Sequence, residues 1–175
     1  MNHPLGFVRT DIRKLLFFAF LAGTLGLFAV FRVLDAPLGT PAAPNGIVSF
    51  ELAGNVEATT EILLSWDERA DLFAAFGLGI DYLFMPVYAT ALALGILLAA
   101  GRHPGWFAAL GAWLGWGGYA VAVFDAVENY ALARMLLMNE VWSPYPQVAA
   151  YSATVKFGLL AVGLFFALAG WLWKK

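Results

Sequence analysis

The sequence predicts an all-α integral membrane protein, an antiparallel four-helix transmembrane bundle. Of its 175 residues, 62% are hydrophobic and 13% are charged, whereas a soluble domain has roughly 25% charged residues. The chain also contains four long apolar runs. Each has an uncharged stretch of about 17–20 residues, which covers most of a ~30 Å hydrocarbon core at ~1.5 Å per residue. Finally, most of the basic and acidic residues outside these runs fall on opposite sides of the predicted membrane.

The predicted spans lie within a single domain of residues 1–175 and cover about 14–34, 71–101, 105–138 and 146–173. The first run resembles a signal peptide because Arg9, Arg13 and Lys14 precede it. Its apolar part, Leu15–Phe31, is longer than the roughly 7–15 residues of a signal peptide, and no small-residue cleavage site follows. We therefore expect a retained first span.

Residues 35–70 form a predicted external loop that contains a short amphipathic helix. Asn55 is a good helix cap, and the residues from it to Trp66 would form a helix with one apolar face and one acidic face. We expect this helix to lie on the outer membrane surface or over the bundle. Residues 65–68, Ser-Trp-Asp-Glu, match a capping box that would open the second span. The tight turn 102–105 makes the second and third spans antiparallel neighbours.

Membrane orientation follows from the positive-inside rule. The basic side carries Arg9, Arg13, Lys14, Arg102, Lys174 and Lys175, and the acidic side carries Asp35, Glu51, Glu57, Glu61, Asp67, Glu68 and Glu140. Both termini are therefore expected in the cytoplasm, and a prokaryotic cytoplasmic membrane is the expected location. Aromatic residues such as Trp66 and Trp142 are predicted interfacial anchors on the outer side.

Charged residues inside the spans are the main candidates for a site. Helical rise places one ionisable group in the second span, two in the third and one in the fourth at similar depths, roughly 15–22 Å from the outer end. A charge facing lipid there costs at least about 2.5–3.5 kcal/mol, so these groups should face inward. The candidate ligand-binding residues are Asp81, Asp125, Glu128, Asn129 and Lys156, with Glu51 and Arg134 as further members.

The faces of the helices agree with this grouping. Asp125, Glu128 and Asn129 are spaced i, i+3, i+4 and share one side of the third span. Along the same side, Gly111 and Gly115 form a small-residue face that predicts close helix contact. Lys156 should pair with carboxylates, but one ammonium cannot neutralise three of them. A protonated carboxylate, water or a bound cation would complete the balance.

Two interpretations of the charges remain open. A buried ion-pair network could fix which helix packs on which, although such networks are often no more stabilising than apolar contacts. Alternatively, the charges line an outward-facing intramembrane pocket that binds a lipid, a small amphiphile or a cation. The pocket could belong to an enzyme that uses a carboxylate and Lys156 on a lipid-soluble substrate. The chain could also be a non-catalytic subunit of a larger membrane complex, or a homo-oligomer.

Other classes of function are not supported. The net charge of −2 and the lack of a basic run argue against a nucleic-acid partner, so membrane lipids are the expected partners. With no cysteine, the chain cannot form disulfides or thiolate metal sites. Lys156 opposes a bound cation, and His3 and His103 lie away from the charged residues, so no metal site is predicted. No motif identifies a cofactor or a reaction.

Overall fold

The computed structural model describes residues 2–138 and 140–173, and this part of the chain is helical with no strand. Its four long helices are α1 (Arg13–Asp35), α4 (Glu68–Ala100), α5 (Trp106–Met138) and α6 (Tyr145–Leu172). All four are long and apolar enough to cross a membrane, which confirms the predicted all-α class with four candidate spans and indicates a membrane location. The largest difference is in α4, which begins at Glu68 and not near Asp71.

Three short helices connect α1 to α4. They are a 3₁₀ helix, η1 (Ala36–Leu38), and the α-helices α2 (Ile47–Glu51) and α3 (Val56–Ser65). Asn55 is the N-cap of α3, and its side-chain oxygen accepts a hydrogen bond from the Ala58 amide at 2.8 Å. That bond satisfies one of the amides that the first turn of any helix leaves without an internal partner.

The predicted capping box at the start of α4 is wrong. Asp67 caps this helix, because its Oδ1 accepts a hydrogen bond from the Ala70 amide at 2.8 Å. Ser65 is the last residue of α3, and its hydroxyl donates to the Ile62 carbonyl at 2.7 Å. A residue inside one helix cannot also adopt the extended conformation of an N-cap, so the cap falls to the next suitable side chain.

The chain forms two compact units, and each long helix contributes to both. Unit 1 comprises Met1–Leu25, Met85–Val123 and Lys156–Lys175, and unit 2 comprises Gly26–Phe84 and Phe124–Val155. Lys174 and Lys175, which support the predicted orientation, lie outside the described residues. The units divide α4 between Phe84 and Met85, and Pro86 is the next residue of this helix.

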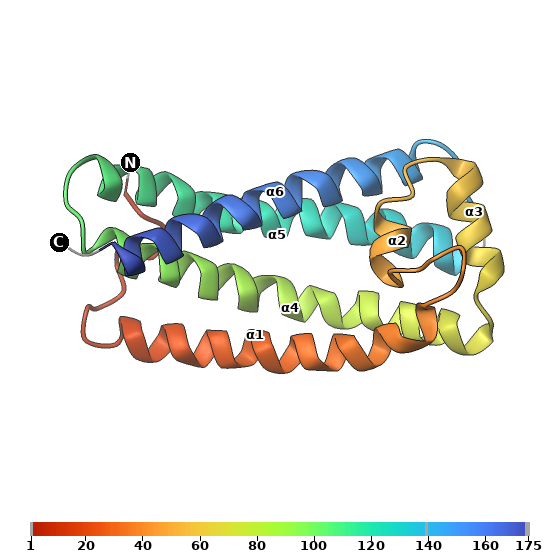
Figure 1. Ribbon diagram of the computed structural model, residues 1–175, viewed down its shortest axis with the longest axis horizontal. Helices are drawn as coiled ribbons and strands as arrows, with labels where there is room; N and C mark the ends of the chain where they lie inside the picture. The colour runs from red at the N-terminus through yellow and green to blue at the C-terminus, as the bar shows by residue number, and fades with distance from the viewer. Residues whose placement is uncertain (1, 139, 174–175) are drawn as a thin grey trace. The chain divides into compact units, whose positions relative to one another are not determined.

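Unit 1 is held together by aromatic and small residues. The rings of Phe107 on α5 and Phe166 on α6 stack with their centroids 4.2 Å apart. Gly111 lies so close to Ala100 and Phe166 that a Cβ could not be added without displacing them. Figure 1 shows the α4–α5 turn, the residues before α1 and the end of α6 at the same end of this unit. The predicted close helix contact is therefore present at Gly111.

The core of unit 2 joins the loop helices to α4, α5 and α6. Figure 1 shows α2 and α3 beside the start of α4 and the end of α5. The buried members of this core are Leu38, Ala43, Phe50, Ile62, Trp66, Ala70, Ala74, Leu78, Ala131, Leu132, Met135 and Ala149. Residues from η1, α2, α3, α4, α5 and α6 therefore contribute to a single apolar cluster.

Trp66 is part of this core, so its predicted role as an interfacial anchor is wrong. Its indole N–H donates to the Leu38 carbonyl at 2.9 Å, and its ring meets Phe50 edge to face at 5.3 Å. The loop between α1 and α4 supplies both the apolar surface and the hydrogen-bond acceptor that a tryptophan at an interface would otherwise obtain from lipid and water. Trp142 remains exposed.

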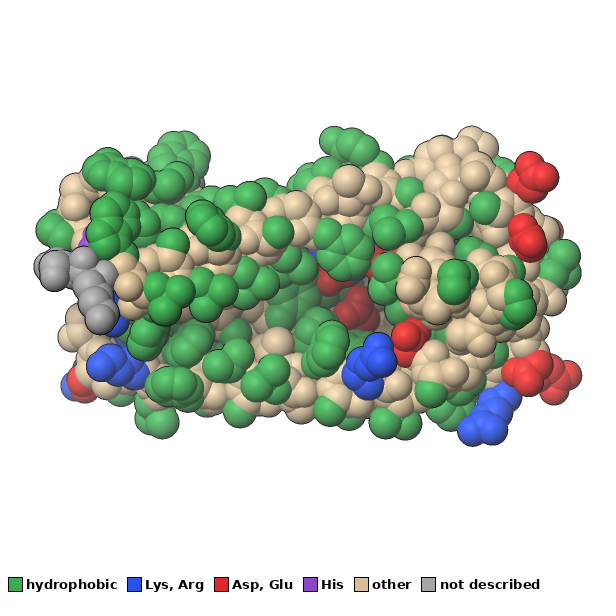
Figure 2. Space-filling view, in the orientation of Figure 1, with side chains coloured by type: hydrophobic (Ala, Val, Ile, Leu, Met, Phe, Trp, Pro, Cys, Tyr) green, Lys and Arg blue, Asp and Glu red, His purple; other side chains and the backbone are tan. Residues whose placement is uncertain are grey.

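The long helices expose apolar side chains in the manner of a membrane protein. Large apolar side chains are exposed on all four of them, and α1 has no buried residue at all. Figure 2 shows apolar side chains covering the helices, with acidic side chains gathered at the α3 end of unit 2. A soluble protein rarely exposes apolar area on this scale, so hydrocarbon is the solvent that fits these faces.

Candidate functional site

The second half of α5 is polar on its buried side and apolar on its exposed side. Asp125, Glu128 and Asn129 are 3%, 0% and 2% exposed. The i, i+3, i+4 spacing places all three on one side of the helix. Val123 and Val127, on the opposite side, are 64% and 44% exposed. This distribution is the reverse of that in a water-soluble helix, so the polar groups lie inside the protein and the valines face an apolar environment.

Asn129 connects α5 to α4 within unit 2. Its side-chain amide donates to the backbone carbonyl of Leu78 at 2.9 Å, and both groups are buried. A helical carbonyl has a second lone pair beyond the one used along the helix, so this bond adds to the α4 ladder without breaking it. Asn129 was predicted to bind a ligand, and the structure gives its amide a role in joining two helices.

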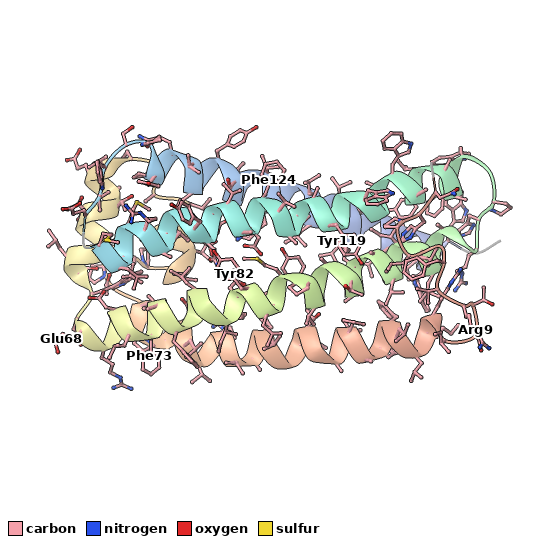
Figure 3. All side chains as sticks on the ribbon, turned by 180° about the vertical axis from the view of Figure 1, so that it is seen from behind. Arg9, Glu68, Phe73, Tyr82, Tyr119 and Phe124 are labelled. Atoms are coloured by element: carbon pink, nitrogen blue, oxygen red, sulfur yellow. The ribbon has the colours of Figure 1, made fainter. Side chains whose placement is uncertain are left out.

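The four acidic candidate residues come from three helices of unit 2. Asp125 and Glu128 lie on α5, Asp81 lies on α4, and Glu51 is the last residue of α2. Asp81 and Glu51 are half-buried, and each of the four side chains interacts with another group of the protein. Figure 3 labels Tyr82, which follows Asp81 on α4, and Phe124, which precedes Asp125 on α5.

Glu51 is partly buried although it lies in the connection between α1 and α4. A loop carboxylate surrounded by water would be exposed, whereas Glu51 is half-buried at the end of α2 and interacts with the protein. The preceding residue, Phe50, is almost completely buried in the unit 2 core. Glu51 is therefore held at the edge of that core.

Arg134 carries a buried nitrogen with no hydrogen bond. It is half-buried on α5, and its Nε has no hydrogen-bond partner among the described residues. Thr59, on α3, is fully buried, and its hydroxyl likewise has no hydrogen-bond partner in the described part of the chain. Sequence patterns did not single out Thr59 or the buried Ser152 of α6 as site residues, because helix periodicity predicts burial but not the pairing of hydroxyls.

Lys156 belongs to unit 1. It is 6% exposed on α6, and its ammonium nitrogen lies 4.8 Å from the centroid of the Phe157 ring. A lysine above an aromatic face gains a cation–π attraction that offsets part of its desolvation. Its predicted pairing with the carboxylates stays a prediction.

Metal ligation was not predicted for the charged residues. Among the residues that the structure describes, no group of three or more His, Asp or Glu side chains could hold a metal ion. The carboxyl, amide and guanidinium groups of unit 2 can donate and accept hydrogen bonds, and such bonds are stronger in an apolar environment than in water.

Known proteins offer no guide to this site: no family model, curated protein or solved structure matches the chain significantly.

Proposed function

We propose that this protein is a polytopic membrane protein that binds a membrane lipid or a small amphiphile in unit 2. The observation that carries the proposal is the burial of Asp125 and Glu128 on α5, opposite an apolar exposed face. Burying carboxylates in a membrane span is costly, and simple helix registry is achieved as well by apolar side chains. Intramembrane ionisable groups more often mark a functional site.

The proposed ligand has a polar head and an apolar body. Carboxyl and amide groups on the inner side of α5, together with Asp81 of α4, would hydrogen-bond the head, and the apolar residues of the spans would contact the body. Glu51 and Arg134 are proposed as further polar contacts. Lys156 is proposed as a counter-charge to the carboxylates. It follows the buried Ser152 of α6 by one helical turn.

The proposal includes the membrane topology. Four spans that cross in alternate directions form an antiparallel bundle, place the loop 35–70 outside and leave both termini in the cytoplasm. This arrangement is supported by the basic residues before α1 and in the α4–α5 turn, and by the acidic residues of α3. The polar groups would then be reached from the outer side.

The test is native mass spectrometry of the protein purified in a mild detergent, with thermal unfolding measured on the same samples. The wild-type protein should retain an amphiphile. Asp125→Asn and Glu128→Gln should reduce the retained amphiphile at least about tenfold while the protein still folds, because each change removes charge but keeps shape. Glu57→Gln, on the exposed side of α3, is the matched control and should have no effect.

Three outcomes would overturn the proposal. A wild-type protein that retains no amphiphile, even after incubation with lipid, would refute it directly. Stabilisation by Mg²⁺ or Ca²⁺ alone would favour a cation. If the single variants unfold the protein and a combined Lys156→Met change restores it, the charged residues fix helix registry and do not bind a ligand.

A further inference from the structure

The segment before α1 is anchored on the helices of unit 1. The carbonyl of Asn2 accepts a hydrogen bond from the indole N–H of Trp116 on α5, at 3.0 Å. Arg13, at the start of α1, folds back onto the same segment and donates to the carbonyls of Val8 at 2.8 Å and Gly6 at 3.0 Å. Figure 3 labels Arg9 in this segment. Residues 2–12, the strap, are therefore attached to α5 near Asn2 and to the start of α1 through Arg13.

The imidazole of His3 fills a space on α5 that only a glycine leaves open. A Cβ added at Gly115 would collide with Nε2 of His3. The small-residue face predicted for Gly111 and Gly115 therefore serves two purposes, since Gly111 contacts neighbouring helices and Gly115 receives a side chain of the strap. The backbone of Ala93, on α4, also faces the ring.

Hydrogen bonding fixes the tautomer of the seated, neutral ring. Nδ1 of His3 accepts a hydrogen bond from the Leu5 amide at 3.1 Å, so in the neutral ring the proton is on Nε2. Nε2 is buried and faces the backbone of Ala93, with no hydrogen bond of good geometry to the described residues. A second proton would have to go to Nδ1, where it would replace the bond from Leu5 with a contact between two donors.

The surroundings of the ring also disfavour its charged form. Burial lowers the pKa of His3 to about 4. The Ala93 backbone acts in the opposite direction, and the nearby Arg13 guanidinium adds a still smaller lowering of this pKa. Arg13 is the charged group of the described residues that acts on the ring. The residues facing it from α4 and α5, Ala93, Gly115 and Trp116, are uncharged.

We propose that the strap is seated on α5 while His3 is neutral and is released when His3 gains a proton, which opens the face of α5 at Gly115. A released His3 has an ordinary pKa near 6.5. Between about pH 6.5 and pH 4 the released form therefore binds more protons than the seated form, and acidification favours release. Below about pH 4 both forms are protonated, and the dependence levels off.

Pulsed electron–electron resonance tests this proposal, because a chain with no cysteine accepts a clean pair of spin labels. Phe7→Cys on the strap and Trp113→Cys on α5 are suitable, since the native side chains are 83% and 63% exposed. At pH 7.5 the distance distribution should be narrow. At pH 4 it should be broad, with the ratio of released to seated protein raised by up to about a hundredfold.

Matched variants separate release from general unfolding by acid. In the labelled background, His3→Phe fills the space without a titratable group, so its distribution should stay narrow at both pH values. Gly115→Ala should give the broad distribution even at pH 7.5, because its methyl group takes the place of the ring. Gly117→Ala, where a Cβ would meet nothing within 4 Å, should behave as the wild type.

The proposal is wrong if the distribution of the wild-type protein is the same at both pH values, or if His3→Phe responds to acid as the wild type does. If His3→Phe does not seat at neutral pH, His3→Gln provides the same test with a polar neutral side chain. None of these outcomes depends on whether unit 2 binds an amphiphile.

Discussion

At the scale of single residues, the buried hydrogen bond from Asn129 to the Leu78 carbonyl is a contact whose contribution can be measured. Asn129→Leu keeps the volume and removes the donor, and we expect it to lower the free energy of unfolding by about 1 kcal/mol. The loss is modest because Leu78 retains its helical hydrogen bond. Unfolding in mixed detergent micelles measures the change.

Asn129→Asp provides the contrast. It places a carboxyl oxygen opposite a carbonyl oxygen, so two acceptors face each other in a buried position. We expect a loss of roughly 2–3 kcal/mol, clearly larger than that of Asn129→Leu. Tyr130→Phe, on the exposed side of the same turn, should change stability by less than about 0.5 kcal/mol. Equal losses for the two Asn129 variants would show that the hydrogen bond to Leu78 is not formed.

Gly46 is the residue at which backbone and side-chain constraints coincide. Its φ is +56°, and a Cβ there would collide with the Asp35 carboxylate, which accepts a hydrogen bond from the Ile47 amide at 2.7 Å. Gly54 also has a positive φ, +69°, but the nearest atom to an added Cβ is 3.5 Å away. The two glycines therefore differ mainly in their neighbours.

We expect Gly54→Ala to cost about 1 kcal/mol and Gly46→Ala to cost at least about 2 kcal/mol, because only the second change adds a collision to the backbone strain. Thermal unfolding of both variants in the same detergent measures the difference. The combination of Gly46→Ala with Asp35→Ala should recover part of the loss. Equal costs for the two single variants would rule out a decisive contact with Asp35.

At the scale of elements, the start of α4 shows how neighbouring helices compete for one capping residue. Ser65 and Asp67 are both good N-caps, and α3 keeps Ser65 in its last turn, so Asp67 caps α4. We expect Asp67→Ala to cost about 1 kcal/mol of unfolding free energy. Glu68→Ala should cost less than about 0.5 kcal/mol, whereas a capping box would make Glu68 nearly as important.

The helix α5 shows what periodicity can and cannot predict. The spacing of Asp125, Glu128 and Asn129 predicted one shared face, and all three are buried. The same reasoning placed Gly111 and Gly115 on a helix-contact face, but it could not show that Gly115 receives His3 from another part of the chain. A periodic pattern specifies which side of a helix is covered, whereas the identity of the covering group depends on contacts distant in sequence.

At the scale of the whole molecule, the distribution of charge predicts a topology that single cysteines can test. We expect Glu57→Cys, on the exposed side of α3, to react with a membrane-impermeant maleimide in intact cells. Arg102→Cys, in the exposed α4–α5 turn, should react only after permeabilisation. The physical reason is that basic residues are retained on the cytoplasmic side during insertion. If Arg102→Cys reacts in intact cells and Glu57→Cys does not, the topology is the inverse of the one proposed.

The sequence alone determined the length and apolarity of the spans. It also determined that three polar residues share one face of α5. Hydrocarbon requires every span to satisfy its backbone internally, so composition and length suffice to predict helices. Tertiary structure decided that Trp66 is buried against Phe50, that Asp67 and not Ser65 caps α4, and that the strap places His3 at Gly115. Each of these depends on which of several chemically suitable partners the folded chain brings within reach, and local sequence does not encode that choice.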